Sequence, residues 1–392
     1  MYQRTTPRIL LALGLCLFTI DTAVAATSGT GSFFFPPSPP PGNNRLLIGL
    51  AAPGTGQIDG GSVVNSAGNN FGSAAYVGVD NGNGILLVTD PGSQLNMGSG
   101  NALRIGANAG TATGSVTVQN GGAINLTNEA LVVGVSRDAG AKNGSLTIDN
   151  ATVTVGTAGS GTRSLFVGHG ENGGTNSSGI VTLSGNATLT VADNAFFGRG
   201  ATSNSGQLNI NGAGNTFDVG GRMFMNFAGG EGSMQVESGN TVNIGRLTLQ
   251  GSDVGSGLTA PTGAGTIELV INDLATWNPI DVDTILDLNV DGGSHLLVDF
   301  TDGVLPGNIS VGDEIDLITY ASFTGAAFDT VGTTITDSLG NEYLLAQDST
   351  HTFLQVTSVV PEPASIALWS LLGVALLGVG CVRRTRRGVK QR

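Results

Sequence analysis

The sequence predicts an all-β protein whose central part is a parallel β-helix, and three observations carry that prediction. Glycine supplies 63 of the 392 residues, well above a typical usage of roughly 7%. A unit of about 29 residues recurs, and each copy holds three short runs in which apolar and polar residues alternate. Charged residues make up 11% of the chain, less than half of the roughly 25% typical of soluble domains. Together these features favour a β-solenoid of about seven stacked coils.

The repeat is clearest at the end of its first run, where a glycine recurs at spacings of 29, 28, 28, 34, 30 and 28 residues. The positions are Gly49, Gly78, Gly106, Gly134, Gly168, Gly198 and, in the same slot, Asn226. Strands this short cannot each bury an apolar row alone, whereas stacked coils enclose one continuous core. Glycine suits a corner because it adopts positive φ without steric cost. The pairs Asn120-Gly121 and Asn150-Ala151 predict a second corner. A two-layered sandwich is the alternative fold, but a fixed repeat is not expected of it.

Composition divides the chain into segments, and the sharpest change is in charge. Residues 247–360 contain sixteen acidic residues and no Lys or Arg. The predicted segments are a signal peptide at 1–25, a Pro-rich linker at 26–45, the solenoid at 46–250, a linker at 251–265, an acidic β cap domain at 266–358 and a sorting signal at 359–392.

The N-terminus is typical of a secretory signal. Arg4 and Arg8 precede an apolar run over 9–20, and a small-x-small site ends at Ala25. Cleavage by signal peptidase after Ala25 is therefore expected. A lipoprotein signal is the weaker alternative, because the residue before Cys16 is not small.

The C-terminus contains a charge-free stretch over 364–382, which is long enough to cross a bilayer as a helix. The triplet Pro361, Glu362 and Pro363 precedes it. Basic residues follow it at Arg383, Arg384, Arg386, Arg387, Lys390 and Arg392. The positive-inside rule places that tail in the cytoplasm and the rest of the chain outside the inner membrane. A plain single-pass anchor is the alternative interpretation.

This order of Pro-Glu-Pro, apolar helix and Arg cluster resembles the PEP-CTERM sorting signal of Gram-negative bacteria that make extracellular polysaccharide. The resemblance implies processing by exosortase, a membrane-embedded protease-like enzyme, and delivery to the cell surface or to a biofilm matrix. The repeats over 46–250 resemble autotransporter-type β-strand repeats, which specify a fold and not an activity.

Parallel β-helices also house polysaccharide lyases and hydrolases, so an enzyme is the rival function. The triplet Gly168-His169-Gly170 is similar to one found in polygalacturonases. Neighbouring coils, however, offer Val135 and Arg199 in the position of His169, with no carboxylate. We therefore predict no catalytic residue and interpret His169 as a loop histidine.

Cofactor and partner chemistry is sparse. Neither His295 nor His351 belongs to a ligand-spaced motif, so no metal site is predicted. Acidic residues in the cap domain could recruit Ca²⁺, although solvated surface charge is the favoured interpretation; these are Asp281, Asp283, Asp287 and Asp291. The mature span 26–360 has eight basic and 27 acidic residues, a net charge of −19, which argues against nucleic acid as a partner.

One feature departs from a plain solenoid. The slot two residues before each repeat glycine should face outward, and it contains large side chains at Tyr76, Phe166, Phe196 and Phe224. These four residues are the candidate partner-binding stripe, for extracellular polysaccharide or a neighbouring molecule. The alternative is that another segment covers them. The function we expect is a secreted, exosortase-sorted structural or adhesive protein of the surface or extracellular matrix, without catalytic activity or cofactor.

Overall fold

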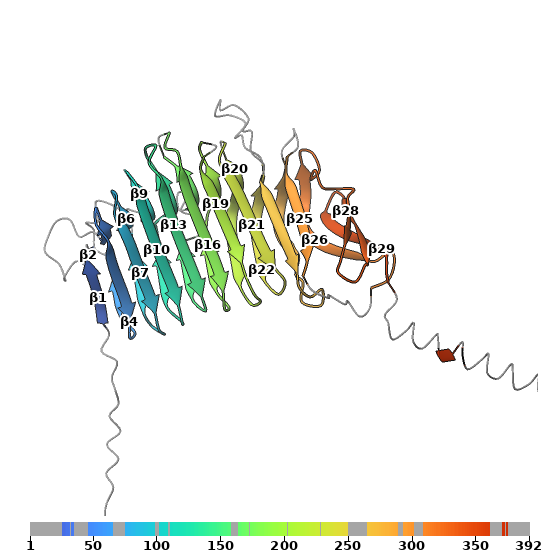
Figure 1. Cartoon of the computed structure of the whole chain (residues 1–392), viewed down its shortest axis with the longest axis horizontal. Helices are drawn as coiled ribbons and strands as arrows, with labels where there is room; N and C mark the ends of the chain where they lie inside the picture. Colours follow the sequence, from blue (N-terminus) through green and yellow to red (C-terminus); the bar gives the residue numbers. More distant parts are fainter. Residues whose placement is uncertain are drawn as a thin grey trace, which may run out of the picture.

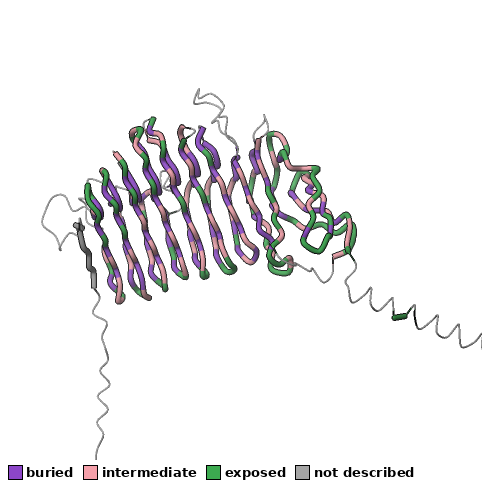
Figure 2. Tube along the Cα trace, viewed as in Figure 1, coloured by how far each residue is buried: buried purple, intermediate pink, exposed green. Residues whose placement is uncertain are grey.

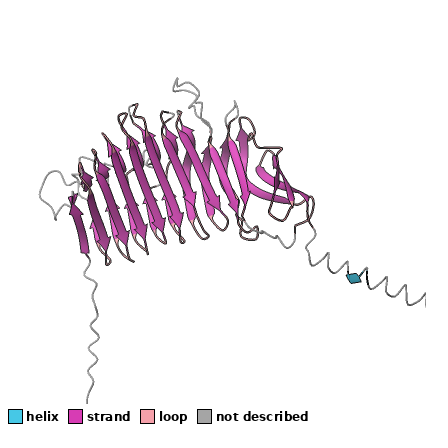
Figure 3. Ribbon diagram, viewed as in Figure 1, coloured by secondary structure: helices cyan, strands magenta, loops and turns pink. Residues whose placement is uncertain are grey.

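The computed structural model describes residues 26–31, 33–34, 46–65, 75–98, 102–108, 110–157, 164–171, 173–201, 203–227, 229–249, 265–288, 293–301, 309–360, 371–372 and 374. The strands stack side by side into an elongated body, and they follow one another along it in chain order (Figure 1, Figure 3). The predicted all-β class and the parallel β-solenoid of about seven coils are thus confirmed.

Each coil contributes three strands. Separate first strands are β3 (Leu47–Leu50), β6 (Ala75–Val79), β9 (Leu103–Asn108), β12 (Leu131–Ser136), β15 (Leu165–Gly170) and β18 (Ala195–Arg199). Middle strands are β4 (Gly54–Asp59), β7 (Asn83–Thr89), β10 (Ala112–Gln119), β13 (Lys142–Asp149), β16 (Ser177–Ser184), β19 (Ser205–Ile210), β21 (Glu231–Glu237), β23 (Thr266–Ile271) and β25 (His295–Phe300). Separate third strands are β5 (Val63–Asn65), β8 (Gln94–Met97), β11 (Ala123–Leu126), β14 (Thr152–Val155) and β17 (Thr188–Val191).

Three longer strands run from the third position of one coil into the first position of the next. They are β20 (Thr216–Phe227), β22 (Thr241–Thr248) and β24 (Ile280–Asp287). The register breaks midway along each of them, as between Val219 and Arg222 in β20. The next strand in this stack is β26 (Glu314–Thr324), which pairs in parallel with β24.

The core runs the length of the body because equivalent residues align coil upon coil. The β12–β15 register pairs Val133 with Val167, and the β15–β18 register pairs Val167 with Phe197. All three side chains are fully buried. Buried and more exposed residues alternate along most strands, as Figure 2 shows and as a strand with one face on a core requires.

The predicted separate acidic domain is not supported, because parallel stacking continues beyond residue 265. Strand β23 pairs in parallel with β21 and β25, and β24 pairs in parallel with β22 and β26. The inward residues Ile267 and Leu269 of β23 are fully buried, whereas Glu268 between them is not. The composition therefore changes only among outward residues, and the apolar rows that stack the coils persist. Of the predicted linker over 251–265, all but Gly265 lies outside the described residues.

Antiparallel strands close both ends of the solenoid. At the N-terminal end, β1 (Ala26–Gly31) pairs with β4 and β2 (Phe33–Phe34) pairs with β3. This corrects part of the predicted linker at 26–45, because the first coil offers unpaired backbone groups that a strand can satisfy. At the other end, β27 (Thr334–Thr336), β28 (Glu342–Gln347) and β29 (His351–Ser358) pair in antiparallel fashion, with β29 also bonded to β26.

The repeat glycine is predicted at a corner, but it lies inside the first strand, as Gly168 does in β15, at a point where the backbones of neighbouring coils meet. Gly168 has φ +65°, and a Cβ built on it would lie 1.8 Å from the carbonyl oxygen of Ser205 on the next coil. Both the positive φ and this approach exclude a side chain. At the predicted second corner, Asn120 and Asn150 have φ of 52° and 48°, which confirms their role as corner residues.

Candidate functional site

The predicted sorting motif lies outside the described residues. This holds for Pro361, Glu362, Pro363, Arg383, Arg384, Arg386 and Arg387, and for the stretch 364–382 apart from residues 371, 372 and 374. Within the part of the chain that the structure describes, no helix is both long and apolar enough to span a bilayer.

The candidate partner-binding stripe lies on the outer face of the first strands. Leu165 and Val167 point into the core, while Phe166 between them is half-buried and stands outside it. The predicted strand register is therefore correct. The left-handed Gly168 interrupts the alternation, because Val132 and Val135, which flank the equivalent glycine on β12, belong to the same outer apolar cluster. Two rows of outward residues result. One consists of the residues two positions before each repeat glycine, and the other of the residues directly after it.

Three of the four stripe residues form a continuous stack, which we call the aromatic column: Phe166, Phe196 and Phe224. Phe166 and Phe196 have ring centroids 4.9 Å apart with planes 7° from parallel, and Phe196 and Phe224 have centroids 4.7 Å apart with planes 3° from parallel. The parallel register imposes this stack, since it pairs the three residues directly on consecutive coils. Phe166 and Phe196 are half-buried and Phe224 is 8% exposed.

Tyr76 does not belong to the column. Along its row, Arg104 and Val132 occupy the positions between Tyr76 and Phe166. Instead, Tyr76 packs in the small outer cluster of Ala107, Val132 and Val135, which Phe166 also touches. The expected four-residue stripe is thus an aromatic column joined to an aliphatic cluster, and since that cluster is buried, this part of the row is covered and not exposed.

The second outward row brings cationic and aromatic groups beside the column. The register aligns His169, Arg199 and Phe227 on consecutive coils. The Arg199 guanidinium carbon lies 5.5, 5.1 and 5.3 Å from the centroids of Phe166, Phe196 and Phe227. Phe227 meets Phe196 and Phe224 edge to face, at 73° and 72°. The sequence shows this row at the residue after each glycine, but its orientation depends on the left-handed conformation of that glycine.

His169 is 7% exposed and its ring lies 4.9 Å from that of Phe166. Burial and then the neighbouring Arg199 lower the pKa of His169 to about 4, so its imidazole is neutral at pH 7. Its Nδ1 is buried and has no hydrogen-bond partner among the described residues. The aligned residues on the adjacent coils are Val135 and Arg199, so no carboxylate is aligned beside it as an acid–base partner.

Two ion-pair groups flank this region. Glu171 accepts from Arg104 at 2.8 Å and from Arg137 at 2.7 Å. Burial raises the pKa of Glu171, but the two arginines outweigh it and hold that pKa below its ordinary value.

On the other side, Asp287 accepts from Arg222 at 2.9 Å and from Arg246 at 2.6 Å, and its side chain is 4% exposed. Thr324 also donates to Asp287, at 2.8 Å. A carboxylate beyond residue 265 thus bonds to side chains of the coils before and after it, as expected if the solenoid is continuous.

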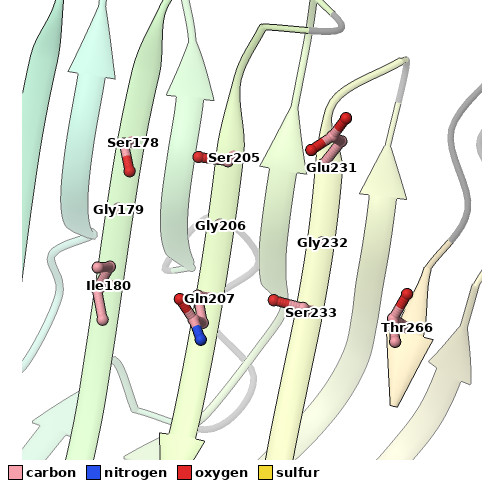
Figure 4. Close-up of a pocket in the computed structure, with 10 residues that line it drawn as sticks. All are labelled: Ser178, Gly179, Ile180, Ser205, Gly206, Gln207, Glu231, Gly232, Ser233 and Thr266. Carbon is pink, nitrogen blue, oxygen red and sulfur yellow. The ribbon is translucent and has the colours of Figure 1, made fainter. Parts of the chain in front are cut away.

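A shallow groove of about 280 Å³ lies on the adjacent face, across β16, β19, β21 and β23 (Figure 4). Its floor is the glycine row of the middle strands, and its sides are hydroxyl, amide, carboxylate and aliphatic groups. The lining residues are Ser178, Gly179, Ile180, Ser205, Gly206, Gln207, Glu231, Gly232, Ser233 and Thr266. Glu231 is the one titratable residue among them, so the groove can donate and accept hydrogen bonds but offers no paired carboxylates.

Among the residues with described positions, no group of three or more His, Cys, Asp or Glu side chains is arranged to hold a metal ion. Asp291, one of the four acidic residues considered for Ca²⁺, lies outside the described residues. Comparisons with protein-family models, with curated proteins and with solved structures give no match to this chain.

Proposed function

We propose that this chain is an exported structural or adhesive protein of the bacterial surface or extracellular matrix, without catalytic activity of its own. The observation that supports this proposal best is the uninterrupted parallel stack from β3 to β26, which makes a stiff elongated body. Its outward columns on the middle strands are largely uncharged, as at Thr117, Thr147, Thr182 and Asn209. Such a body can hold a binding surface away from its point of attachment.

Delivery is part of the proposal. A signal peptide ending at Ala25 would direct export, and the Pro361-Glu362-Pro363 motif with its Arg cluster would direct exosortase processing. Mass spectrometry of the mature C-terminus from the native host tests this step. We expect the mature chain to lack the stretch from about residue 364 onward, and recovery of the intact tail from surface material would contradict sorting.

A polysaccharide-degrading enzyme is the rival, and a turnover assay separates the two. The protein is incubated with neutral and acidic polysaccharides while new reducing ends and unsaturated products are measured. We expect no turnover. Turnover that is lost in His169→Ala or Glu171→Gln would overturn the proposed function.

A further inference from the structure

Among the described arginines of this face, Arg199 is the one whose guanidinium forms no hydrogen-bonded ion pair, although the Glu171 carboxylate is close enough to act on its charge. Arg104 and Arg137 share Glu171, and Arg222 and Arg246 share Asp287. The Arg199 side chain forms no ion pair or hydrogen bond with any described residue, and its contacts are with aromatic rings. Since a guanidinium stays protonated in proteins, this position carries a positive charge without a bonded anion.

The aromatic rings do not compensate that charge fully. A cation gains most from the face of an aromatic ring, whereas the ring edge is weakly positive. Phe196 has another ring on each face, at 4.7 and 4.9 Å, so Arg199 approaches it from the edge. Phe227 is tilted out of the column, and its centroid lies 5.3 Å from the Arg199 guanidinium carbon. Ring edges and guanidinium together make a surface that favours an anion.

The site is also prepared for binding. Packing between Phe166, Phe196 and Phe227 restricts the Arg199 side chain before a ligand arrives, which lowers the entropy lost on association. Burial lowers the pKa of Arg199 from its ordinary value, and the nearby Glu171 carboxylate opposes this shift only in part. An ion pair gains strength in such a place. Beside it, the neutral His169 has a buried Nδ1 without a partner among the described residues.

We propose that Arg199 is the recognition residue of a binding site for an acidic polysaccharide, with its guanidinium paired to a sugar carboxylate. This inference rests on the proposed adhesive function and names its partner. The planar guanidinium can bind a carboxylate through two parallel hydrogen bonds. A carboxylate attached to a hydroxyl-rich chain fits better than an isolated anion, because groups that can bind hydroxyls line the groove on the middle strands.

Those groups line the groove of Figure 4. Arg199 ends β18 and Ser205 begins β19, and Asn204 between them donates from Nδ2 to the Arg199 carbonyl at 3.1 Å. Ser205 and Gln207 both line the groove. Their counterparts recur at the strand spacing of roughly 4.8 Å along the body. An extended glycan could therefore place its carboxylate on Arg199 and its hydroxyls on the middle strands.

Binding of the purified full-length chain to polygalacturonate tests the proposal, with dextran as the uncharged comparison and vesicles containing phosphatidylglycerol as another anionic surface. Arg199→Gln should weaken polygalacturonate binding at least tenfold. Arg137→Gln is the matched control, since it removes one positive charge from an arginine whose side chain is 43% exposed and already paired. We expect the control to change affinity less than twofold. Thermal unfolding of each variant checks that the fold is retained.

Arg199→Lys keeps the charge and the long aliphatic stem, so it provides a second measurement if the glutamine variant does not fold. It should bind several-fold more weakly than wild type, because an ammonium lacks the planar fork. The proposal would be overturned if Arg199→Gln bound polygalacturonate with wild-type affinity. It would also be overturned if Arg199→Lys and the control Arg137→Gln both bound with wild-type affinity. Binding to vesicles but not to polygalacturonate would also overturn it. Cleavage of bound polygalacturonate would instead overturn the non-catalytic function and leave the role of Arg199 standing.

Discussion

The rings of Phe196 and Phe224 lie 4.7 Å apart and within 3° of parallel, on consecutive coils of the solenoid. Their separation matches the spacing of paired β-strands, about 4.7–4.9 Å. The column is thus a product of coil stacking, and it presents ring edges to the outside. The rings therefore support the coils and also restrict Arg199, which carries the charge.

Replacement of the central ring of the column should weaken the fold. Phe196→Ala removes the ring that stacks against both Phe166 and Phe224, for an expected loss of about 2–4 kcal/mol in the free energy of unfolding. Thr182→Ala, on the outer face of a middle strand, should change it by less than about 0.5 kcal/mol. Denaturant unfolding measures both. A loss below about 1 kcal/mol for Phe196→Ala would show that the column adds little to stacking.

The repeat glycine of β15 should tolerate no side chain. Gly168→Ala incurs the left-handed penalty of roughly 1–2 kcal/mol and also places Cβ against the Ser205 carbonyl oxygen. Gly173→Ala is the matched control, since Gly173 has φ +82° and a methyl group placed there would meet nothing within 4 Å. We expect Gly168→Ala to be markedly the more destabilising of the two in thermal unfolding. Equal effects would mean that the backbone around Gly168 can relax.

Stability should depend on pH through His169. Its pKa falls to about 4 in the folded chain, against about 6.5 when unfolded, so the unfolded state binds the proton first as pH decreases. As pH falls from about 6.5 to about 4, the folded protein therefore loses on the order of 3 kcal/mol of unfolding free energy. His169→Asn lacks this titration. The difference in unfolding free energy between wild type and variant should fall across that window, and a constant difference would contradict the burial of His169.

The carboxylate of Asp287 should hold coils together across residue 265. Asp287→Asn leaves Arg222 and Arg246 without their shared anion, and we expect a loss of about 2–4 kcal/mol in unfolding free energy. Asp218→Asn, on an outward position of β20, serves as the control and should cost less than about 0.5 kcal/mol. Chemical denaturation followed by circular dichroism measures both. An unchanged transition in Asp287→Asn would imply that these coils unfold independently.

The sequence alone determined the fold class, the coil repeat and the strand faces, because each depends on local rules. The left-handed Gly168 sets a bend in its strand, and the alternation at Leu165 and Val167 sets a core-facing row, whatever the distant sequence is. The same rules placed Phe166, Phe196 and Phe224 on one outward row. The change in charge near residue 250 was misleading, since net charge reports outward residues and Ile267 and Leu269 keep the inward pattern.

Only the tertiary structure decided how the outward side chains meet. Whether stacked phenylalanines present faces or edges depends on the register between coils, and the pairing of Glu171 with Arg104 joins residues 67 positions apart. Arg199 forms no ion pair because the carboxylates of Glu171 and Asp287 are bonded to neighbouring arginines. Local sequence patterns do not show which arginine binds which carboxylate, because ion pairs depend on distances in the folded chain. The repeat therefore specifies the scaffold, and the packing of its outer rows specifies the site.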